Sequence, residues 1–320
     1  MDLNTFLTTY EVQVRLGFFF GVFAVMAAWE MLAPRRALRV SKLVRWGNNL
    51  ALVFLNSVLL RLLFPAAAVG MAAFAAEQGW GIFNYLAVPA AVAIVASVIA
   101  LDFVIYLQHV MVHAVPALWR LHRVHHADMD LDVTTGARFH PLEIILSMLI
   151  KFATIAVLGP PVVAVVIFEV LLNATAMFNH SNVRMPGALD RVLRWLVVTP
   201  DMHRVHHSVE DDEANSNFGF NLPWWDRLFG TYRDQPRSGH EGMTIGIRGY
   251  RQAREVSWLP PHCRFVSRIP RRGSRDVSRL SQHPRDLSGI PRRGASVAIG
   301  LPPQLTRARG IPRSGSSDVS

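Results

Sequence analysis

The chain contains almost no cysteine and few charged residues. Its 320 residues include one cysteine, Cys263, so no intrachain disulfide can form. Because Cys263 lies in the last quarter of the chain, the rest of the sequence offers no thiolate to a metal ion. Charged residues make up 18% of the chain and hydrophobic residues 51%, whereas a soluble domain usually has about 25% charged residues. This composition argues against a soluble globule and favours a membrane protein.

Basic residues are missing from the N-terminus. No lysine or arginine precedes Arg15, and the acidic residues Asp2 and Glu11 occur there instead. A cleaved signal peptide begins with a positively charged region, so this segment does not fit one. We therefore expect the first apolar run to stay in the mature protein.

The basic residues are concentrated at the end of the chain. Residues 1–232 contain 16 lysines and arginines against 17 acidic residues, whereas residues 233–320 contain 17 arginines against 6 acidic residues. In this last segment a motif of the type Ile-Pro-Arg-Arg-Gly begins at Ile269, Ile290 and Ile311, at a spacing of 21 residues. These units have too few large apolar residues to bury a core, so we expect residues 233–320 to form a disordered tail. The body has no basic nucleic-acid motif, and we expect no nucleic-acid partner.

Long apolar runs cover much of the body, at about 12–32, 50–76, 86–107 and 142–178. The first three reach the roughly 20 residues that a helix needs to cross a bilayer. Gly159, Pro160 and Pro161 break the fourth run into two arms, which predicts a helical hairpin that either crosses twice or dips in and returns. The sequence predicts an all-α integral membrane bundle of about three spans plus a hairpin, with N-terminal transmembrane helices in residues 1–95.

The loops predict the orientation of this bundle. The stretch between the first two predicted spans is rich in basic residues, namely Arg35, Arg36, Arg39, Lys42 and Arg45, whereas residues 77–85 contain none. Short cytoplasmic loops retain lysine and arginine, so the basic loop is expected in the cytoplasm. Counting crossings from there, the chain returns to the cytoplasm near His109 and again near His180.

The histidines are clustered. None precedes position 109, and ten of the 13 fall between 109 and 207. His109 and His113 are four residues apart, and two His-x-x-His-His motifs begin at His122 and His203. Positions i, i+3 and i+4 of a helix project to the same side, so each motif presents its imidazoles to one point. The eight motif histidines are His109, His113, His122, His125, His126, His203, His206 and His207.

Eight imidazoles brought together indicate metal binding. Without a cation, such a cluster would leave many ring nitrogens unsatisfied and would repel itself on protonation. Imidazole ligands suit Zn, Cu, Fe and Ni. Eight ligands are too many for one ion, since a structural zinc needs four. The count favours a dimetal centre in a histidine-rich cap.

The motifs and their order resemble the membrane-bound fatty acid hydroxylase and sterol desaturase superfamily, the histidine-rich non-haem di-iron oxygenases. The resemblance covers about 100–231. It also rests on Asp102, Tyr106 and residues 138–143 (RFHPLE), 178–182 (FNHSN), 199–203 (TPDMH), 217–219 (NFG) and 225–231 (WDRLFGT). It implies a catalytic domain over residues 96–232 that binds two iron ions, activates O2 and oxidises a C–H bond of a lipid taken from the bilayer.

The resemblance also assigns roles to residues. The eight motif histidines are implied to be metal ligands and catalytic residues, and His180 is implied to be a ninth ligand. His140 precedes Pro141 and either binds metal or has a structural role. Asp102 lies two helical turns before His109 on nearly the same face. Its carboxylate either accepts the ring N–H of a ligating histidine, which is the favoured role, or reaches interfacial water at the helix end. Asp201, Asp226, Asn182 and Asn217 are expected to orient loops, while Val110 stands where many members of the family have arginine.

The electrons must come from another protein. The sequence has no Gly-x-Gly-x-x-Gly fingerprint, no cysteine cluster for an iron–sulfur centre and no haem module. The family implies a ferredoxin or cytochrome partner that is reduced by an NAD(P)H reductase. The acidic run 210–213 either docks this partner or forms a solvated loop.

Clustered histidines also occur in proteins that do not oxidise a substrate. A metal transporter would have ligands through the depth of the membrane, and a scaffold would use the histidines without catalysis. The His-Glu-x-x-His motif of hydrolytic zinc enzymes is absent. Sterol-like and fatty acyl substrates come first, and hydroxylation and desaturation both remain open, because the two reactions begin with the same hydrogen abstraction.

Overall fold

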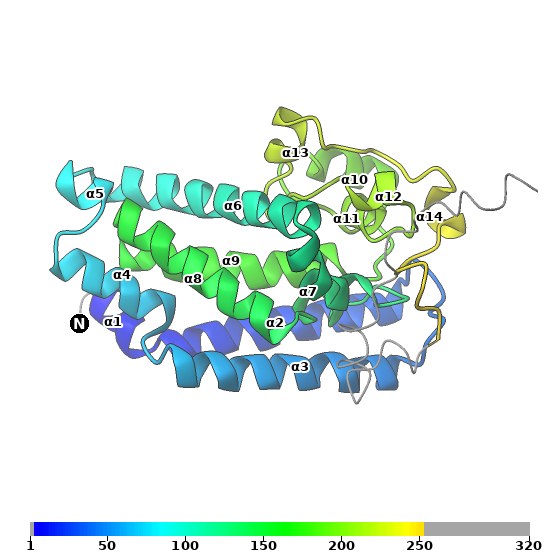
Figure 1. Ribbon diagram of the computed structural model, residues 1–320, viewed down its shortest axis with the longest axis horizontal. Helices are drawn as coiled ribbons and strands as arrows, with labels where there is room; N and C mark the ends of the chain where they lie inside the picture. Colours follow the sequence, from blue (N-terminus) through cyan, green and yellow to red (C-terminus); the bar gives the residue numbers. More distant parts are fainter. Residues whose placement is uncertain (1–2, 253–320) are drawn as a thin grey trace, which may run out of the picture. The chain divides into compact units, whose positions relative to one another are not determined.

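The computed structural model describes residues 3–252, and this part of the chain is built from helices joined by turns (Figure 1). The helices are α1 (Leu3–Thr9), α2 (Glu11–Leu32), α3 (Lys42–Leu63), α4 (Ala67–Glu77), α5 (Ile82–Tyr85), α6 (Ala90–Ala114), α7 (Pro116–His126), the 3₁₀ turn η1 (Thr135–Ala137), α8 (Pro141–Leu158), α9 (Val162–Asn179), α10 (Gly187–Leu193), α11 (Pro200–His206), α12 (Asp211–Ala214), α13 (Trp224–Leu228) and α14 (Gly239–Gly242). Residues 3–252 contain isolated β-bridges but no strand. The predicted all-α fold is confirmed.

Five segments of the described chain are long and apolar enough to cross a membrane. They are α2, the 44-residue segment that contains α3, α4 and α5, and the single helices α6, α8 and α9. The helices α8 and α9 have 18 residues each, or about 27 Å at 1.5 Å per residue. Each arm of the predicted hairpin is therefore close to the thickness of the hydrocarbon core, and three spans plus a hairpin are confirmed.

The direction of these helices brings distant segments to one end of the bundle. In Figure 1, α2, α6 and α9 run towards the end drawn on the right, and α3 and α8 run back from it. The basic loop between α2 and α3 thus lies at the same end as the C-termini of α6 and α9. His109 and His180, which sequence analysis placed on one side of the membrane, are both at this end.

Large apolar side chains cover the outer surface of the spans. Phe20 on α2, Phe54 and Leu62 on α3, and Val157 on α8 are each 60% exposed or more. A soluble monomer rarely exposes so much apolar surface. These side chains face lipid in a multi-pass membrane protein.

A pair of glycines permits the tight turn between α8 and α9. Gly159 has a positive φ of 64° and ends α8, and two prolines follow it. A Cβ atom on Gly81 would lie 2.1 Å from the nitrogen of Gly159, so no larger residue fits where the α4–α5 turn crosses the hairpin. The α4–α5 turn therefore packs directly against the tip of the hairpin that the Gly-Pro-Pro sequence predicts.

The ionisable residues inside the spans neutralise one another. Glu169 on α9 pairs with Lys151 on α8 at 2.6 Å and with Arg15 on α2 at 3.0 Å, and Arg15 also pairs with Glu11. An unpaired charge in a bilayer is expensive. These contacts tie α2, α8 and α9 together far from the histidine end.

The packed chain extends past residue 232, where we expected the disordered tail to begin. Met243 and Ile245 are buried against Leu131, and the amide of Gly246 donates to the carbonyl of His207 at 3.0 Å. These two buried apolar residues pack the segment 233–252 against the part of the chain that precedes it. The remainder of the predicted tail, residues 253–320, lies outside the described residues.

We predict that a chain ending after residue 252 keeps the thermal stability of the full chain, whereas one ending after residue 232 does not. The shorter chain loses two buried side chains, each worth about 1.5–3 kcal/mol, and should unfold at a lower temperature. Thermal unfolding in detergent measures the difference. Equal midpoints for the 232-residue and full chains would show that the segment does not stabilise the body.

Candidate metal centre

The first two histidine motifs lie on either side of a helix break. His109 and His113 occupy the last turns of α6. This helix ends at Ala114, and after the single residue Val115 the next helix, α7, starts at Pro116. Proline is favoured in the first turn of a helix because it has no N–H to leave unpaired. The chain therefore turns at this point, and α7 brings its own three histidines back towards the end of α6.

The third motif is set by a capped helix. Thr199 is the N-cap of α11 and accepts a hydrogen bond from the amide of Met202, with Pro200 in the first turn. His203 and His206 lie on α11 and His207 is its C-cap. His180 is the C-cap of α9, at the end of the hairpin.

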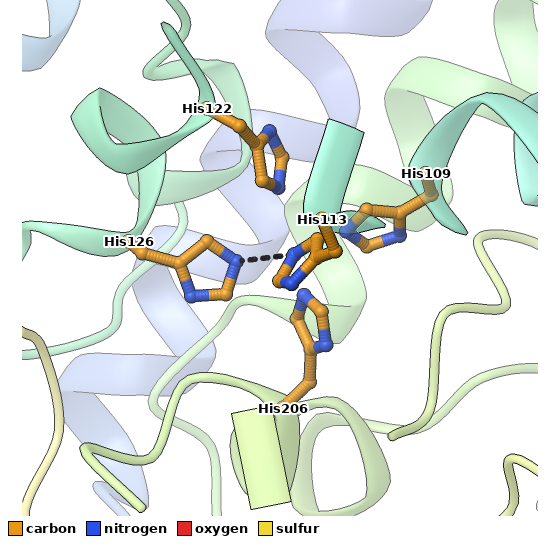
Figure 2. Close-up of side chains that lie close together, drawn as sticks. All are labelled: His109, His113, His122, His126 and His206. Atoms are coloured by element: carbon orange, nitrogen blue, oxygen red, sulfur yellow. Dashed lines mark hydrogen bonds between the residues drawn. The ribbon is translucent and has the colours of Figure 1, made fainter. Parts of the chain in front are cut away.

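The nine predicted ligands form two groups, each with ring nitrogens close enough to share one metal ion. Within a group the nitrogens that would bind lie within 4.8 Å of one another. The first group, in which the rings converge from α6, α7 and α11 (Figure 2), is His109, His113, His122, His126 and His206. The second group is His125, His180, His203 and His207. Eight of the nine side chains are buried, and His113 is partly buried.

Hydrogen bonds orient the rings for metal binding. The Nδ1 atoms of His109, His180 and His206 each lie 2.8 Å from a backbone carbonyl oxygen, those of Phe218, Ala176 and Ser216 respectively. A carbonyl oxygen only accepts, so Nδ1 carries the proton and Nε2 keeps its lone pair. That is the form in which a histidine binds a metal.

Several inward-facing nitrogens have no other partner among the described residues. The buried Nε2 atoms of His109, His122, His206 and His207 make no hydrogen bond. In the second group, the Nε2 of His180 lies 3.1 Å from that of His125 and 3.0 Å from that of His203. Two nitrogens at right angles around one ion, each about 2.1 Å away, are separated by roughly this distance. The donor set therefore fits two nitrogen-bound metal ions.

Burial keeps these rings neutral. It lowers the pKa of His180 to about 4. Burial also lowers the pKa of His125, His126, His203, His206 and His207 well below the ordinary value for histidine, with a further decrease from neighbouring histidines. Neutral imidazole is the metal-binding form, so these rings are ready to bind metal at pH 7.

Sequence analysis did not single out Glu143, which holds one of the ligands. Its Oε1 accepts a hydrogen bond from His122 Nδ1 at 2.7 Å, while its Oε2 is buried without a partner in the described chain. The available signal was its place in the first turn of α8, three residues after His140. His140 itself belongs to neither group: it is the N-cap of α8 and accepts from the amide of Leu142.

The loop after α12 carries two of the carbonyls that orient histidines. Asn217 adopts a left-handed conformation with φ of 51°, and its Nδ2 donates to Met202 and Arg233 carbonyls. Asp226 accepts from the amides of Phe218 and Gly219, both at 2.7 Å. Burial raises the pKa of Asp226 to about 6, partly opposed by these hydrogen bonds. Asn217 and Asp226 thus orient the loop, in agreement with the sequence analysis.

The expected contact between Asp102 and His109 is absent. Asp102 accepts instead from the indole Nε1 of Trp225 at 2.8 Å and from the amides of Asn221 and Leu222. The prediction was wrong because helical spacing fixes the face on which a carboxylate lies but not which loop packs over it. The loop before α13 reaches Asp102, and the Phe218 carbonyl accepts the hydrogen bond from His109 Nδ1.

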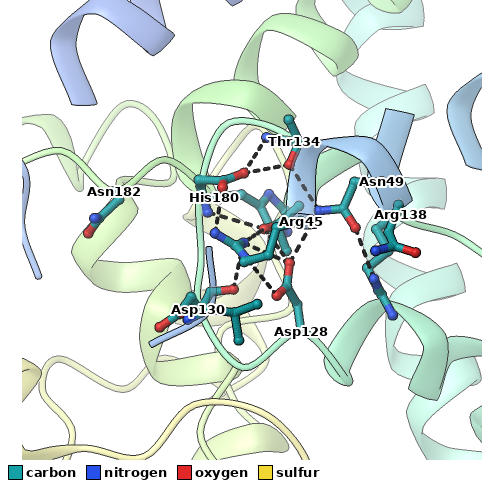
Figure 3. Close-up of polar contacts among 12 residues, drawn as sticks. Arg45, Asn49, Asp128, Asp130, Thr134, Arg138, His180 and Asn182 are labelled. Atoms are coloured by element: carbon teal, nitrogen blue, oxygen red, sulfur yellow. Dashed lines mark hydrogen bonds and ion pairs between the residues drawn. The ribbon is translucent and has the colours of Figure 1, made fainter. Parts of the chain in front are cut away.

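Behind the second group, a buried polar network ties α3 to the turn that follows α7 (Figure 3). Arg45 donates to both carboxylate oxygens of Asp128, at 2.8 and 2.7 Å, and also pairs with Asp132. Asn49 bridges Thr134 and Arg138 at 2.9 Å each. Burial alone would raise the pKa of Asp128, but the Arg45 guanidinium outweighs it and lowers the pKa to about 2. The network fixes the chain that leaves His125 and His126.

A cavity of about 280 Å³ opens among the spans next to the histidines. Its wall includes His109, His122 and His125, and it extends past Leu60 on α3 to Arg15 on α2. On α3 and α6 the lining residues span about two turns, or roughly 10 Å. Most of the other lining residues are apolar, so the cavity fits a hydrocarbon chain beside the histidine groups.

Residues 94–231 match the family described as fatty acid hydroxylase. This match agrees with the resemblance that the histidine motifs indicate. The chain is 32% identical to an ornithine lipid hydroxylase of Rhizobium tropici over 162 residues, 50% of this chain and 47% of that protein. It is 31% identical to an alkylglycerol monooxygenase of Xenopus tropicalis over 153 residues, 48% of this chain and 33% of the relative. The human alkylglycerol monooxygenase is 29% identical over 152 residues.

The match thus spans about half the length of the first relative and a third of the Xenopus protein. No solved structure matches the chain.

We predict that Glu143→Leu weakens metal binding by about 10- to 100-fold, the usual effect of losing a partner that orients a ligating histidine. Glu143→Gln keeps an acceptor oxygen for His122 and should retain most of the affinity. Competition with a graded chelator series measures the metal retained by each variant. Equal retention by Glu143→Leu and the unmodified chain would remove Glu143 from the metal site.

Proposed function

We propose that the chain is a membrane-bound di-iron oxygenase that hydroxylates a lipid, because residues 94–231 match the fatty acid hydroxylase family and carry the histidine motifs. It would use O2 and electrons from a separate donor. The catalytic domain proposed for this reaction is 96–232, preceded by the transmembrane helices of 1–95. Segment 233–252 is a packed addition to that domain.

One observation carries the proposal: two groups of histidines, eight of the nine side chains buried, adjoin a cavity between membrane spans. Five nitrogens in one group and four in the other supply ligands for two ions. Three of these histidines also line the cavity. A lipid chain that enters from the bilayer would therefore meet the metal centre without crossing water.

The nine histidines of the two groups are the proposed ligands, and the eight motif histidines are the proposed catalytic set. Bound iron would supply the activation of O2 that cleaving an unactivated C–H bond requires. The protein contributes the ligand geometry, through carbonyls and Glu143 that hold the rings. It also excludes water, because apolar residues of α3, α6 and α9 close the cavity around the reacting carbon.

Hydroxylation is favoured over desaturation by the relatives. The curated proteins that match are named as a lipid hydroxylase and as monooxygenases. A hydroxylase inserts one oxygen atom of O2 and reduces the other to water with two electrons and two protons. A lipid of the bilayer, sterol-like or fatty acyl, is the proposed substrate class.

The electron donor is proposed to be a ferredoxin or cytochrome with its NAD(P)H reductase, approaching from the cytoplasm. The basic loop at the histidine end supports that orientation. The acidic run is a poor docking site, because Asp212 pairs with Arg233 and Glu210 pairs with Arg248 within the chain. No specific observation favours a transporter, whose ligands would be spread through the membrane depth.

Replacing one ligand in either group should abolish the reaction. We predict that His125→Ala and His206→Ala, one from each group, each remove hydroxylated lipid and lower the metal content. His140→Asn is the matched control, because asparagine preserves the N-cap of α8 and His140 is outside both groups.

The assay is mass spectrometry of lipid extracts from cells that express the full chain under isotopically labelled O2. The unmodified chain and His140→Asn should yield lipids that carry one labelled oxygen. Full product from His125→Ala or His206→Ala would refute the ligand assignment.

A further inference from the structure

The mostly apolar cavity contains two amide oxygens without a partner. Asn56 on α3 is 6% exposed and lines the cavity, and its Oδ1 makes no hydrogen bond among the described residues. Gln108 on α6 also lines the cavity, and its buried Oε1 likewise has no partner there. Buried polar groups are nearly always hydrogen-bonded, because leaving one unpaired costs its full desolvation. Two such atoms in one cavity point to a ligand.

The orientation of Asn56 is fixed by its other end. Its Nδ2 donates to the carbonyl oxygen of Phe139 at 3.0 Å. A carbonyl only accepts, so this contact identifies the nitrogen of the amide and leaves Oδ1 as the group without a partner. An amide oxygen also only accepts. The ligand must therefore bring an O–H or N–H donor.

This acceptor lies close to the metal centre. The ring of Phe139, which Asn56 holds by its carbonyl, stacks on His125 with 4.6 Å between ring centroids and 5° between planes. Gln108 directly precedes His109 on α6. A donor group bound to Asn56 would therefore sit next to the histidine groups, and the attached carbon chain would adjoin them.

We propose that the Oδ1 of Asn56 accepts a hydrogen bond from a hydroxyl or amide N–H of the lipid beside the carbon to be oxidised, in a specificity subsite of the cavity that Gln108 also lines. The proposal rests on the function proposed above. It restricts the substrate to lipids with a hydrogen-bond donor within the cavity, and it disfavours plain hydrocarbon chains. A plain chain would leave both amide oxygens desolvated and unpaired.

Two matched pairs of probes test this subsite: a long-chain secondary amide with its N-methyl derivative, and a long-chain secondary alcohol with its methyl ether. Equilibrium binding of the radiolabelled probes is measured on the full chain in lipid nanodiscs. The unmodified chain should bind the amide or the alcohol about 10-fold more tightly than its blocked partner. The probe that shows this preference identifies the donor.

Variants separate recognition from packing. Asn56→Leu should bind both members of a pair equally, whereas Asn56→Gln keeps both an acceptor oxygen and an N–H for the Phe139 carbonyl and should keep the preference. Asn48→Leu is the matched control, because Asn48 is half-buried on the same helix, is not among the residues that line the cavity, and donates to the carbonyl of Val44. It should behave like the unmodified chain.

Two results would overturn the subsite. One is equal binding of donor and blocked probes by the unmodified chain, which is also the outcome if the amides serve only water. The other is an Asn56→Leu variant that weakens both members of a pair by the same factor, since the residue would then only position Phe139. Binding needs neither O2 nor a reductant, so the result is independent of whether the chain proves to be a hydroxylase.

Discussion

The packing of nine imidazoles, eight of them buried, at one end of an apolar helical bundle is the constraint on which the rest of the structure depends. Burial lowers the pKa of rings such as His125, His180 and His206 and so holds them in the neutral form. Several inward nitrogens then need a partner. The two metal ions proposed above would satisfy that need. The break between α6 and α7 and the capped start of α11 make this packing possible, because they bring the three separated motifs to one place.

The groups around the histidines fix where the rings point. Backbone carbonyls of Ala176, Ser216 and Phe218 hold three rings, and the Glu143 carboxylate holds a fourth. The loop that supplies two of these carbonyls is shaped by the left-handed Asn217. On the other side, Arg45 ties the second transmembrane segment to the turn after α7. The site is therefore rigid although its parts come from distant stretches of sequence.

Much of this could be predicted from the sequence, because membrane spans and ligand motifs are encoded locally. Apolar runs predicted the helices, and spacing predicted that each motif presents one face. The resemblance to the superfamily supplied His180, which no motif contains. Contacts between distant parts of the chain could not be predicted. Asp102 contacts a tryptophan rather than His109, and Glu143, to which the sequence analysis gave no role, holds His122. Met243 and Ile245 show that the packed chain continues past residue 232. Such contacts depend on which loop packs on which helix.

We propose that each of the two histidine groups holds one metal ion, and the account of the site depends on this occupancy. Elemental mass spectrometry of the full chain, purified in detergent after expression with added iron, tests it most directly. The proposed di-iron centre predicts close to two iron ions per chain, because each group supplies at least four ring nitrogens. One metal ion per chain, or none, would contradict the dimetal centre and with it the proposed oxidation of lipids.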